Sequence, residues 1–282
     1  MIGSLLFYLF TFFLGSAVGS FVGVIVDRVM GNEAIWKGRS HCDHCRHKLH
    51  WNDLIPVFSY FMLKGKCRYC HEKLSLFYPI IEIVTGVTYA VVAFALFGGA
   101  WYFIGNLNYL LLLLFYYALI GSLIAILFTD MKFGIIPFKV VLFAVVITLA
   151  WYLLIPSLYF SSLELQMLGL QTNLLNAIAS GLGVALFFFS LFFFTKGRGM
   201  GFGDVVYAFL MGFILGFPKV LLALYLAFIT GAIIALFLVA SKKKKFKGGT
   251  IPFGPFLVFG TIVSMLWGNT IIGYVLSYFM LF

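Results

Sequence analysis

Residues 109–128 read YLLLLLFYYALIGSLIAILF, twenty consecutive residues without a charged side chain. A helix of about 20 mostly apolar residues is long enough to cross the roughly 30 Å hydrocarbon core of a bilayer. Seven other stretches have the same apolar character, and together they predict about eight transmembrane helices. The other seven stretches are 2–26, 80–97, 140–155, 174–195, 205–217, 220–240 and 255–281.

The composition of the chain agrees with a membrane protein. Of its 282 residues, 63% are hydrophobic and only 10% are charged, whereas soluble domains are about 45–50% apolar and about 25% charged. A chain of this size has no interior large enough to bury so much apolar surface. These figures exclude a single soluble domain, a disordered chain and a secreted disulfide scaffold. The predicted fold class is an all-α polytopic membrane protein with a small cytoplasmic zinc-binding loop domain.

The basic residues predict which side of the membrane each loop occupies. The net charge is +10, and eighteen of the nineteen Lys and Arg residues fall in alternate linkers. An excess of Lys and Arg is typical of cytoplasmic loops. We therefore expect these linkers to be cytoplasmic and both termini to lie outside, and we expect no nucleic-acid partner. The basic linkers are 27–79, 129–139, 196–204 and 241–254.

All four cysteines lie in the first basic linker, where Cys42 pairs with Cys45 and Cys67 with Cys70 at Cys-x-x-Cys spacing. Two such pairs can supply the four thiolates of a structural, tetrahedral zinc site. A reducing cytosol disfavours two disulfides, and the loop lacks the βαβ context of thioredoxin-like redox motifs. Bound zinc would supply folding energy that so small a loop lacks. The histidines of the loop are interpreted as solvated, and the exchange of one for a cysteine ligand stays open.

Two aspartates, Asp130 and Asp204, stand at the cytoplasmic ends of predicted spans. Ionisable groups at such a depth are expensive and commonly functional. Because both fall on the same membrane face they can meet, and two close carboxyl groups that share one proton can activate water. Asp204 ends the Gly-Phe-Gly-Asp motif of 201–204, and the Pro/Gly element at 250–256 is expected to present backbone carbonyl groups to the same site. Each aspartate alone is equally well explained as a helix-terminal residue.

The chain resembles the type IV prepilin peptidases, which are aspartic proteases of the Gly-x-Gly-Asp type, and the resemblance covers nearly its whole length. The matching motifs are Gly19-Ser20-Phe21, the cysteine loop from Arg39 to Cys70, Tyr78-Pro79 followed by Glu82, Asp130, Asp204, and Pro-Phe-Gly-Pro-Phe at 252–256.

This resemblance implies a bacterial enzyme of the cytoplasmic membrane that cleaves the basic leader from prepilins or pseudopilins, with Asp130 and Asp204 as the catalytic residues. Many members then methylate the new N-terminus with S-adenosylmethionine, and Glu82 is carried over as a residue for methylation or substrate binding. The implied domains are a first transmembrane helix at 1–26, a cytoplasmic zinc loop at 27–79 and a transmembrane peptidase core at 80–282.

Two other classes of protein remain open from the sequence. A cation- or proton-coupled transporter would use the two aspartates as ligands and the zinc loop as a sensor. Transporters commonly show paired repeats and broken helices near the bilayer midplane, whereas no repeat is visible here and the two acids lie at the membrane edge. A non-catalytic assembly scaffold with a zinc loop would leave both aspartates without a role.

Overall fold

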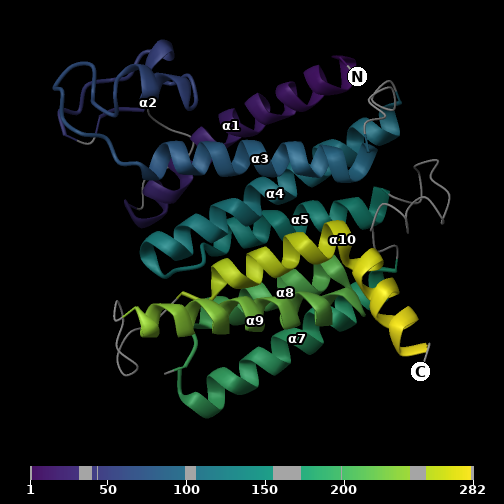
Figure 1. The fold of residues 1–282 in the computed structure, drawn as a ribbon. Helices are drawn as coiled ribbons and strands as arrows, with labels where there is room; N and C mark the ends of the chain where they lie inside the picture. Colours follow the sequence, from purple (N-terminus) through teal and green to yellow (C-terminus); the bar gives the residue numbers. More distant parts are fainter. Residues whose placement is uncertain are drawn as a thin grey trace. The chain divides into compact units, whose positions relative to one another are not determined.

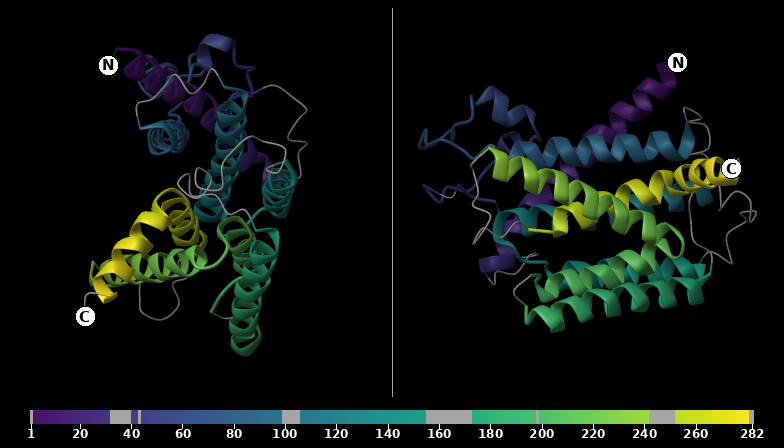
Figure 2. Two further views of the ribbon diagram at one scale, coloured as in Figure 1. Left: turned by 90° about the vertical axis from the view of Figure 1, so that its right-hand side faces the viewer. Right: turned by 60° about the horizontal axis from the view of Figure 1, so that its bottom comes forward.

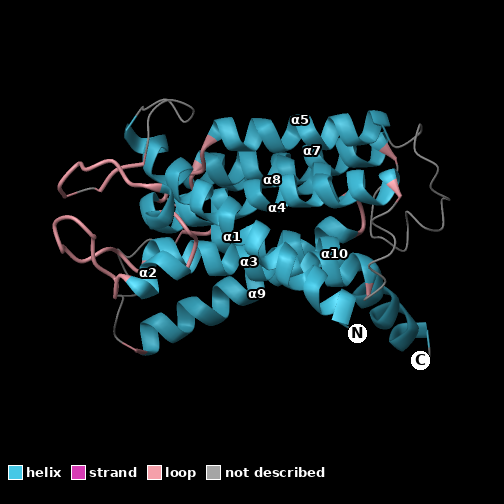
Figure 3. Ribbon diagram, turned by 90° about the horizontal axis from the view of Figure 1, so that it is seen from above, coloured by secondary structure: helices cyan, strands magenta, loops and turns pink. Residues whose placement is uncertain are grey.

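The fold is taken from a computed structural model that describes residues 2–31, 40–42, 44–98, 106–154, 173–197, 199–241 and 252–280. This described part of the chain consists of helices joined by loops and contains no strand (Figure 3). Its apolar helices (Figure 1) are α1 (Ile2–Gly31), α3 (Phe77–Phe97), α4 (Leu107–Phe133), α5 (Phe138–Leu154), α7 (Leu174–Thr195), α8 (Phe202–Leu215), α9 (Lys219–Ala240) and α10 (Gly254–Met280). The predicted all-α membrane class is confirmed, and these eight apolar helices agree roughly with the predicted number of spans.

Six of these helices are long and apolar enough to cross a membrane, and two, α5 and α8, are shorter. The 14 residues of α8 extend only about 21 Å at 1.5 Å per residue, less than the hydrocarbon thickness of a bilayer. Ten of these residues are buried inside the protein. Because protein and not lipid surrounds α8, other protein groups can form the hydrogen bonds that the backbone at its ends requires.

The chain divides into two compact units, Met1–Ala125 and Ile126–Phe282, with the boundary inside α4. The domain boundaries predicted at residues 26 and 79 remain predictions. In the first unit α1 packs along α3 (Figures 1 and 2). A Cβ atom added at Gly19 would lie 2.8 Å from the Cα atom of Glu82, so the two backbones touch there, as small residues allow between membrane helices. The loop between α1 and α3 carries the short helices η1 (Trp51–Asp53) and α2 (Phe58–Met62).

In the second unit α8 occupies the centre, since it packs against α5, α7 and α10, while α9 packs along α10 (Figure 2). The Tyr152 hydroxyl of α5 donates a hydrogen bond to the Phe213 carbonyl oxygen of α8 at 3.2 Å. The hydroxyls of Tyr207 and Thr261 join α8 to α10 at 2.9 Å. These bonds hold α8 in place and so position its first turn, which carries Asp204.

Candidate active site and cysteine cluster

The structure brings Asp130 and Asp204 together in the second unit. Asp130 lies in the last turns of α4 and Asp204 in the first turn of α8, and both are buried, with 5% and 8% of their surface exposed. Both line one cavity of about 370 Å³, and they are close enough for their charges to interact. The two aspartates that were predicted to meet therefore line the same cavity in the fold.

Each carboxyl group is held by one backbone amide. The Gly254 N–H donates to Oδ2 of Asp130 at 3.0 Å, and the Gly201 N–H donates to Oδ2 of Asp204 at 3.1 Å. The second bond is a helix cap, so the capping role considered for Asp204 from the sequence is also present. Within the described part of the chain, Oδ1 of each aspartate has no hydrogen-bond partner. Each residue thus offers one uncommitted oxygen in a shared cavity.

Gly254 is a site residue that the sequence argument missed. The Pro/Gly element was expected to offer carbonyl groups, whereas residue 254 offers its amide hydrogen to Asp130. A Cβ atom at this position would lie 2.6 Å from Oδ2 of Asp130, so any larger residue would displace the Asp130 carboxyl group. In the fold α10 begins at Gly254, and the first N–H groups of a helix have no partner within it, so this amide is available to Asp130.

The remainder of the cavity wall is apolar or glycine. After α4 ends, Gly134 adopts a left-handed backbone with φ of +66° and turns the chain toward α5. A Cβ atom at Gly203 would lie 3.1 Å from the Cβ atom of Ile136, so the Gly-x-Gly-Asp segment packs closely on the connection between α4 and α5. The other lining residues are Ile135, Phe138, Phe202 and Val206. An extended peptide backbone fits beside such a wall more readily than a strongly charged solute.

The four cysteines form a cluster in the first unit, and their sulfur atoms all lie within 4.8 Å of one another. The Cys42 and Cys70 sulfur atoms are 3.9 Å apart, close to the roughly 3.8 Å that Zn–S bonds of about 2.3 Å would give in a tetrahedron. Burial of the Cys67 thiol opposes its ionisation, but the N–H groups of Cys70 and Tyr69 outweigh that effect and lower its pKa to about 7. The donor set fits zinc, and among the described residues no histidine belongs to the cluster.

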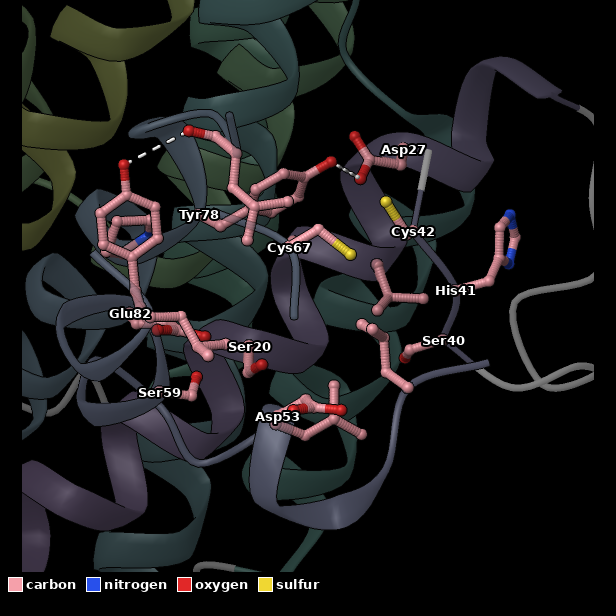
Figure 4. Close-up of a pocket in the computed structure, with 18 of the residues that line it drawn as sticks. Ser20, Asp27, Ser40, His41, Cys42, Asp53, Ser59, Cys67, Tyr78 and Glu82 are labelled. Atoms are coloured by element: carbon pink, nitrogen blue, oxygen red, sulfur yellow. Dashed lines mark hydrogen bonds between the residues drawn. The ribbon is translucent and has the colours of Figure 1, made fainter. Parts of the chain in front are cut away.

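Glu82 lines a different cavity, of about 340 Å³, between α1, α3 and the cysteine loop of the first unit (Figure 4). Its Oε2 atom accepts a hydrogen bond from the Val57 N–H at 2.7 Å, and its carboxyl group also bonds to the Ser20 side chain. None of the described basic residues forms an ion pair with this carboxyl group. Nearby, the Tyr78 hydroxyl donates to Asp27 at 2.9 Å.

Comparison with known proteins finds related sequences over most of the chain. Residues 13–96 match the family described as the bacterial peptidase A24 N-terminal domain, and residues 117–236 match the type IV leader peptidase family. A prepilin leader peptidase/N-methyltransferase of Aeromonas salmonicida (strain A449) is 30% identical over 243 residues, which are 85% of this chain and 75% of that protein. The chain belongs to the type IV prepilin peptidase family.

Other prepilin peptidases are similar over almost their full length. The prepilin leader peptidase/N-methyltransferase of Bacillus subtilis (strain 168) is 29% identical over 93% of this chain and 95% of its own. The prepilin leader peptidase/N-methyltransferase of Aeromonas hydrophila is 26% identical over 98% of this chain and 96% of its own length. No solved structure matches the chain. Membership of a peptidase family identifies a multi-pass bacterial membrane enzyme, and it favours neither the transporter nor the scaffold interpretation.

Each of the two regions that match a family model contains one of the two sites. The region at 117–236 contains Asp130 and Asp204, and the region at 13–96 contains the cysteine cluster and Glu82. Gly254, which holds Asp130, lies beyond both regions. The contact therefore had to be found from the fold.

Proposed function

We propose that this chain is a membrane-embedded aspartic endopeptidase that removes the basic leader from prepilins or pseudopilins. The observation that carries the proposal is the pair of buried aspartates in one cavity, each with an Oδ1 atom that no described residue binds. The relatives named as prepilin leader peptidases support the choice of substrate. A cation site would instead be expected to surround an ion with several oxygen ligands, whereas this cavity is otherwise apolar.

In the proposed mechanism the two carboxyl groups share one proton, because two adjacent carboxylates do not both ionise readily. The ionised group takes a proton from a water molecule as it attacks the scissile carbonyl carbon. The protonated group donates its proton as the carbon–nitrogen bond breaks, and the new α-amino group leaves. The amides of Gly254 and Gly201 keep each carboxyl group in place through Oδ2, so that Oδ1 faces the reaction.

The substrate is expected to approach from the cytoplasmic side. Eighteen of the nineteen basic residues fall in alternate linkers, and the loop after α4 and the segment before α8 are two of these linkers. A prepilin would keep its apolar helix in the bilayer while its leader reaches the aspartates at the cytoplasmic edge. In this arrangement both termini of the enzyme lie outside.

We infer two further properties of the same enzyme. The four cysteines hold a structural zinc ion, because four thiolates close its coordination sphere and leave no open position. The relatives are named N-methyltransferases as well as peptidases, and the cavity of about 340 Å³ in the first unit has the size of a small-molecule site. S-adenosylmethionine, when bound, supplies a methyl group for the new N-terminus of the pilin.

The proposal is tested by co-expressing the chain with a prepilin in a host that lacks prepilin peptidases. Leader removal is followed by the gel shift of the prepilin, with Asp204→Asn as the inactive variant and Glu72→Gln, an exposed acid of the cysteine loop, as the matched control. We expect processing by the wild type and by Glu72→Gln only. An intact prepilin in the presence of stable wild-type protein would refute the assignment.

A further inference from the structure

The short helix α2 of the cysteine loop turns an apolar face outward. Phe58, Phe61 and Met62 are 59%, 65% and 67% exposed, and we call these three side chains the α2 face. Ser59 of the same helix instead faces the cavity of the first unit, which it lines together with Glu82 (Figure 4). Large apolar side chains that are exposed side by side, unlike single ones, mark a surface that contacts another protein or a membrane.

Backbone hydrogen bonds place α2 beside the first turns of α3. The Val57 N–H, directly before α2, donates to Oε2 of Glu82 at 2.7 Å. After α2, the Leu74 N–H donates to the Gly65 carbonyl oxygen at 2.8 Å, shortly before α3 begins at Phe77. Both ends of α2 are therefore tied to the segment from residue 74 to residue 82, and the helix does not extend away into solvent.

The first turns of α3 lie at the edge of the bilayer. The 21 residues of α3 extend about 31 Å at 1.5 Å per residue, which is about the thickness of the hydrocarbon core. The core therefore begins near Phe77, and Glu82 lies about 7.5 Å farther along the helix. The Tyr78 hydroxyl, which donates to Asp27 of α1 at 2.9 Å, has the position typical of tyrosine at the headgroup level. The α2 face is thus at the depth where a membrane protein meets lipid headgroups.

Lysines border the α2 face. Lys64 and Lys66 follow α2 closely, and a backbone bridge joins Lys66 to Lys73. All three lysines are exposed, and none of them forms an ion pair with a described residue. An apolar surface bordered by lysines matches a bilayer with anionic lipids, because apolar side chains enter the acyl boundary while ammonium groups meet phosphates.

We propose that α2 is an interfacial helix, whose apolar face enters the headgroup region of the leaflet at which α3 begins and whose lysines bind anionic lipid there. The bilayer then orients the cysteine loop together with α1 and α3. A protein partner fits the face less well, because it would have to displace lipid from the edge of the bilayer. This inference goes beyond the proposed function and needs no step of its mechanism.

The first test measures the depth of α2. The purified full-length protein is placed, one copy each, in nanodiscs of phosphatidylglycerol and a lipid that is brominated in its upper acyl chain. A fluorescent amino acid replaces Phe61, Ile80 (an exposed residue of α3) or Glu72 (an exposed acid of the loop) in three separate proteins. We expect bromine to quench position 61 about as strongly as position 80, and position 72 only weakly. Quenching at position 61 no stronger than at position 72 would overturn the inference.

The second test measures how often α2 leaves the membrane, from the hydrogen exchange of its amides by mass spectrometry. Each lysine near an anionic surface strengthens attachment about fivefold. Lys64→Gln should therefore speed exchange about fivefold in anionic nanodiscs, and not at all in nanodiscs of neutral phosphatidylcholine. Phe61→Ser should speed exchange about tenfold in both lipids, because an apolar side chain is lost from the acyl boundary. Glu72→Gln is the control and should match the wild type throughout.

Two results of the second test would contradict the inference. An equal effect of Lys64→Gln in both lipids would show that this lysine acts within the protein, and wild-type exchange in Phe61→Ser would show that the α2 face does not touch lipid. Should Phe61→Ser not fold, Met62→Ser removes another side chain of the same face and carries the same expectation. Neither test involves prepilin cleavage, so failure of this inference and failure of the proposed function are distinguishable.

Discussion

At the scale of single residues, the site depends on a glycine as much as on its two aspartates. The Gly254 amide holds Asp130, and there is no space for a Cβ atom between them. We predict that Gly254→Ala slows prepilin cleavage about 100-fold, because a displacement of about 1 Å in a catalytic group can have that effect. The rate of cleavage by purified protein is the measurement.

The matched control for this prediction is Gly273→Ala in the same helix, where a Cβ atom would meet nothing within 4 Å. Alanine is the better helix former, so this variant should be as active as the wild type. Equal rates for Gly254→Ala and Gly273→Ala would contradict the positioning role of residue 254.

The aspartates could be found from the sequence because acids at the ends of apolar spans are rare. Asp130 and Asp204 stand out on that ground, and the glycines before Asp204 strengthen the pattern. The partners of the acids could not be found in this way, since the donors are backbone amides at Gly254, Gly201 and Val57. Every residue except proline carries such a donor, and only the fold decides which one reaches a carboxylate.

At the scale of elements, the cysteine loop consists of two similar turns. The Cys42 N–H bonds to the His47 carbonyl oxygen and the Cys67 N–H to the Glu72 carbonyl oxygen, at 3.0 and 2.9 Å. Each turn then presents its two cysteines to the common cluster. The fold of the loop is therefore expected to depend on zinc.

We predict that Cys67→Ser reduces the zinc content of the purified protein to less than about a tenth and exposes the loop at 40–74 to proteases, because bound metal supplies its folding energy. His44→Ala, which lies between two cysteines but outside the cluster, should keep its zinc. The measurements are metal analysis and limited proteolysis. Loss of zinc in His44→Ala would show that a histidine is a ligand after all.

The packing of α7 on α8 gives a second prediction for an element. A Cβ atom at Gly212 would lie 2.6 Å from the Ser180 carbonyl oxygen, and neither backbone can move without separating the helices. Gly212→Ala should lower the free energy of unfolding by about 1–3 kcal/mol, the usual effect of overpacking. Thermal unfolding in detergent tests this, with Gly183→Ala, which has open space around it, as the control. An unchanged melting temperature in Gly212→Ala would contradict the close packing.

Hydropathy predicted the helices better than it predicted their ends. The span at 174–195 coincides with α7, whereas α1 continues past the predicted residue 26 to Gly31 and α4 past residue 128 to Phe133. The apolar pattern shows which side chains lie in lipid or in the core. A helix, however, continues past the last apolar residue as long as its backbone hydrogen bonds continue. The extra turns matter, because they carry Asp27 and Asp130.

At the scale of the whole molecule, the one-sided distribution of basic residues predicts the orientation in the membrane. An epitope tag inserted in the basic linker 241–254 should be protected in right-side-out vesicles and cleaved by protease in inverted ones. A tag in the linker 156–173, which contains no Lys or Arg, should show the opposite pattern. Tags on the same side, or both patterns reversed, would refute the proposed orientation and the cytoplasmic placement of the aspartates.

The central claim is that Asp130 and Asp204 act as one catalytic unit, and the rates of prepilin cleavage by Asp130→Asn, Asp204→Asn and the double variant test it most directly. Residues that act together give non-additive losses. We predict that each single variant cleaves at least about 10³-fold more slowly than the wild type, within the range for general acid–base groups, and that the double variant is no slower than either. A single variant that cleaves within tenfold of the wild type, or losses that multiply in the double variant, would contradict the account.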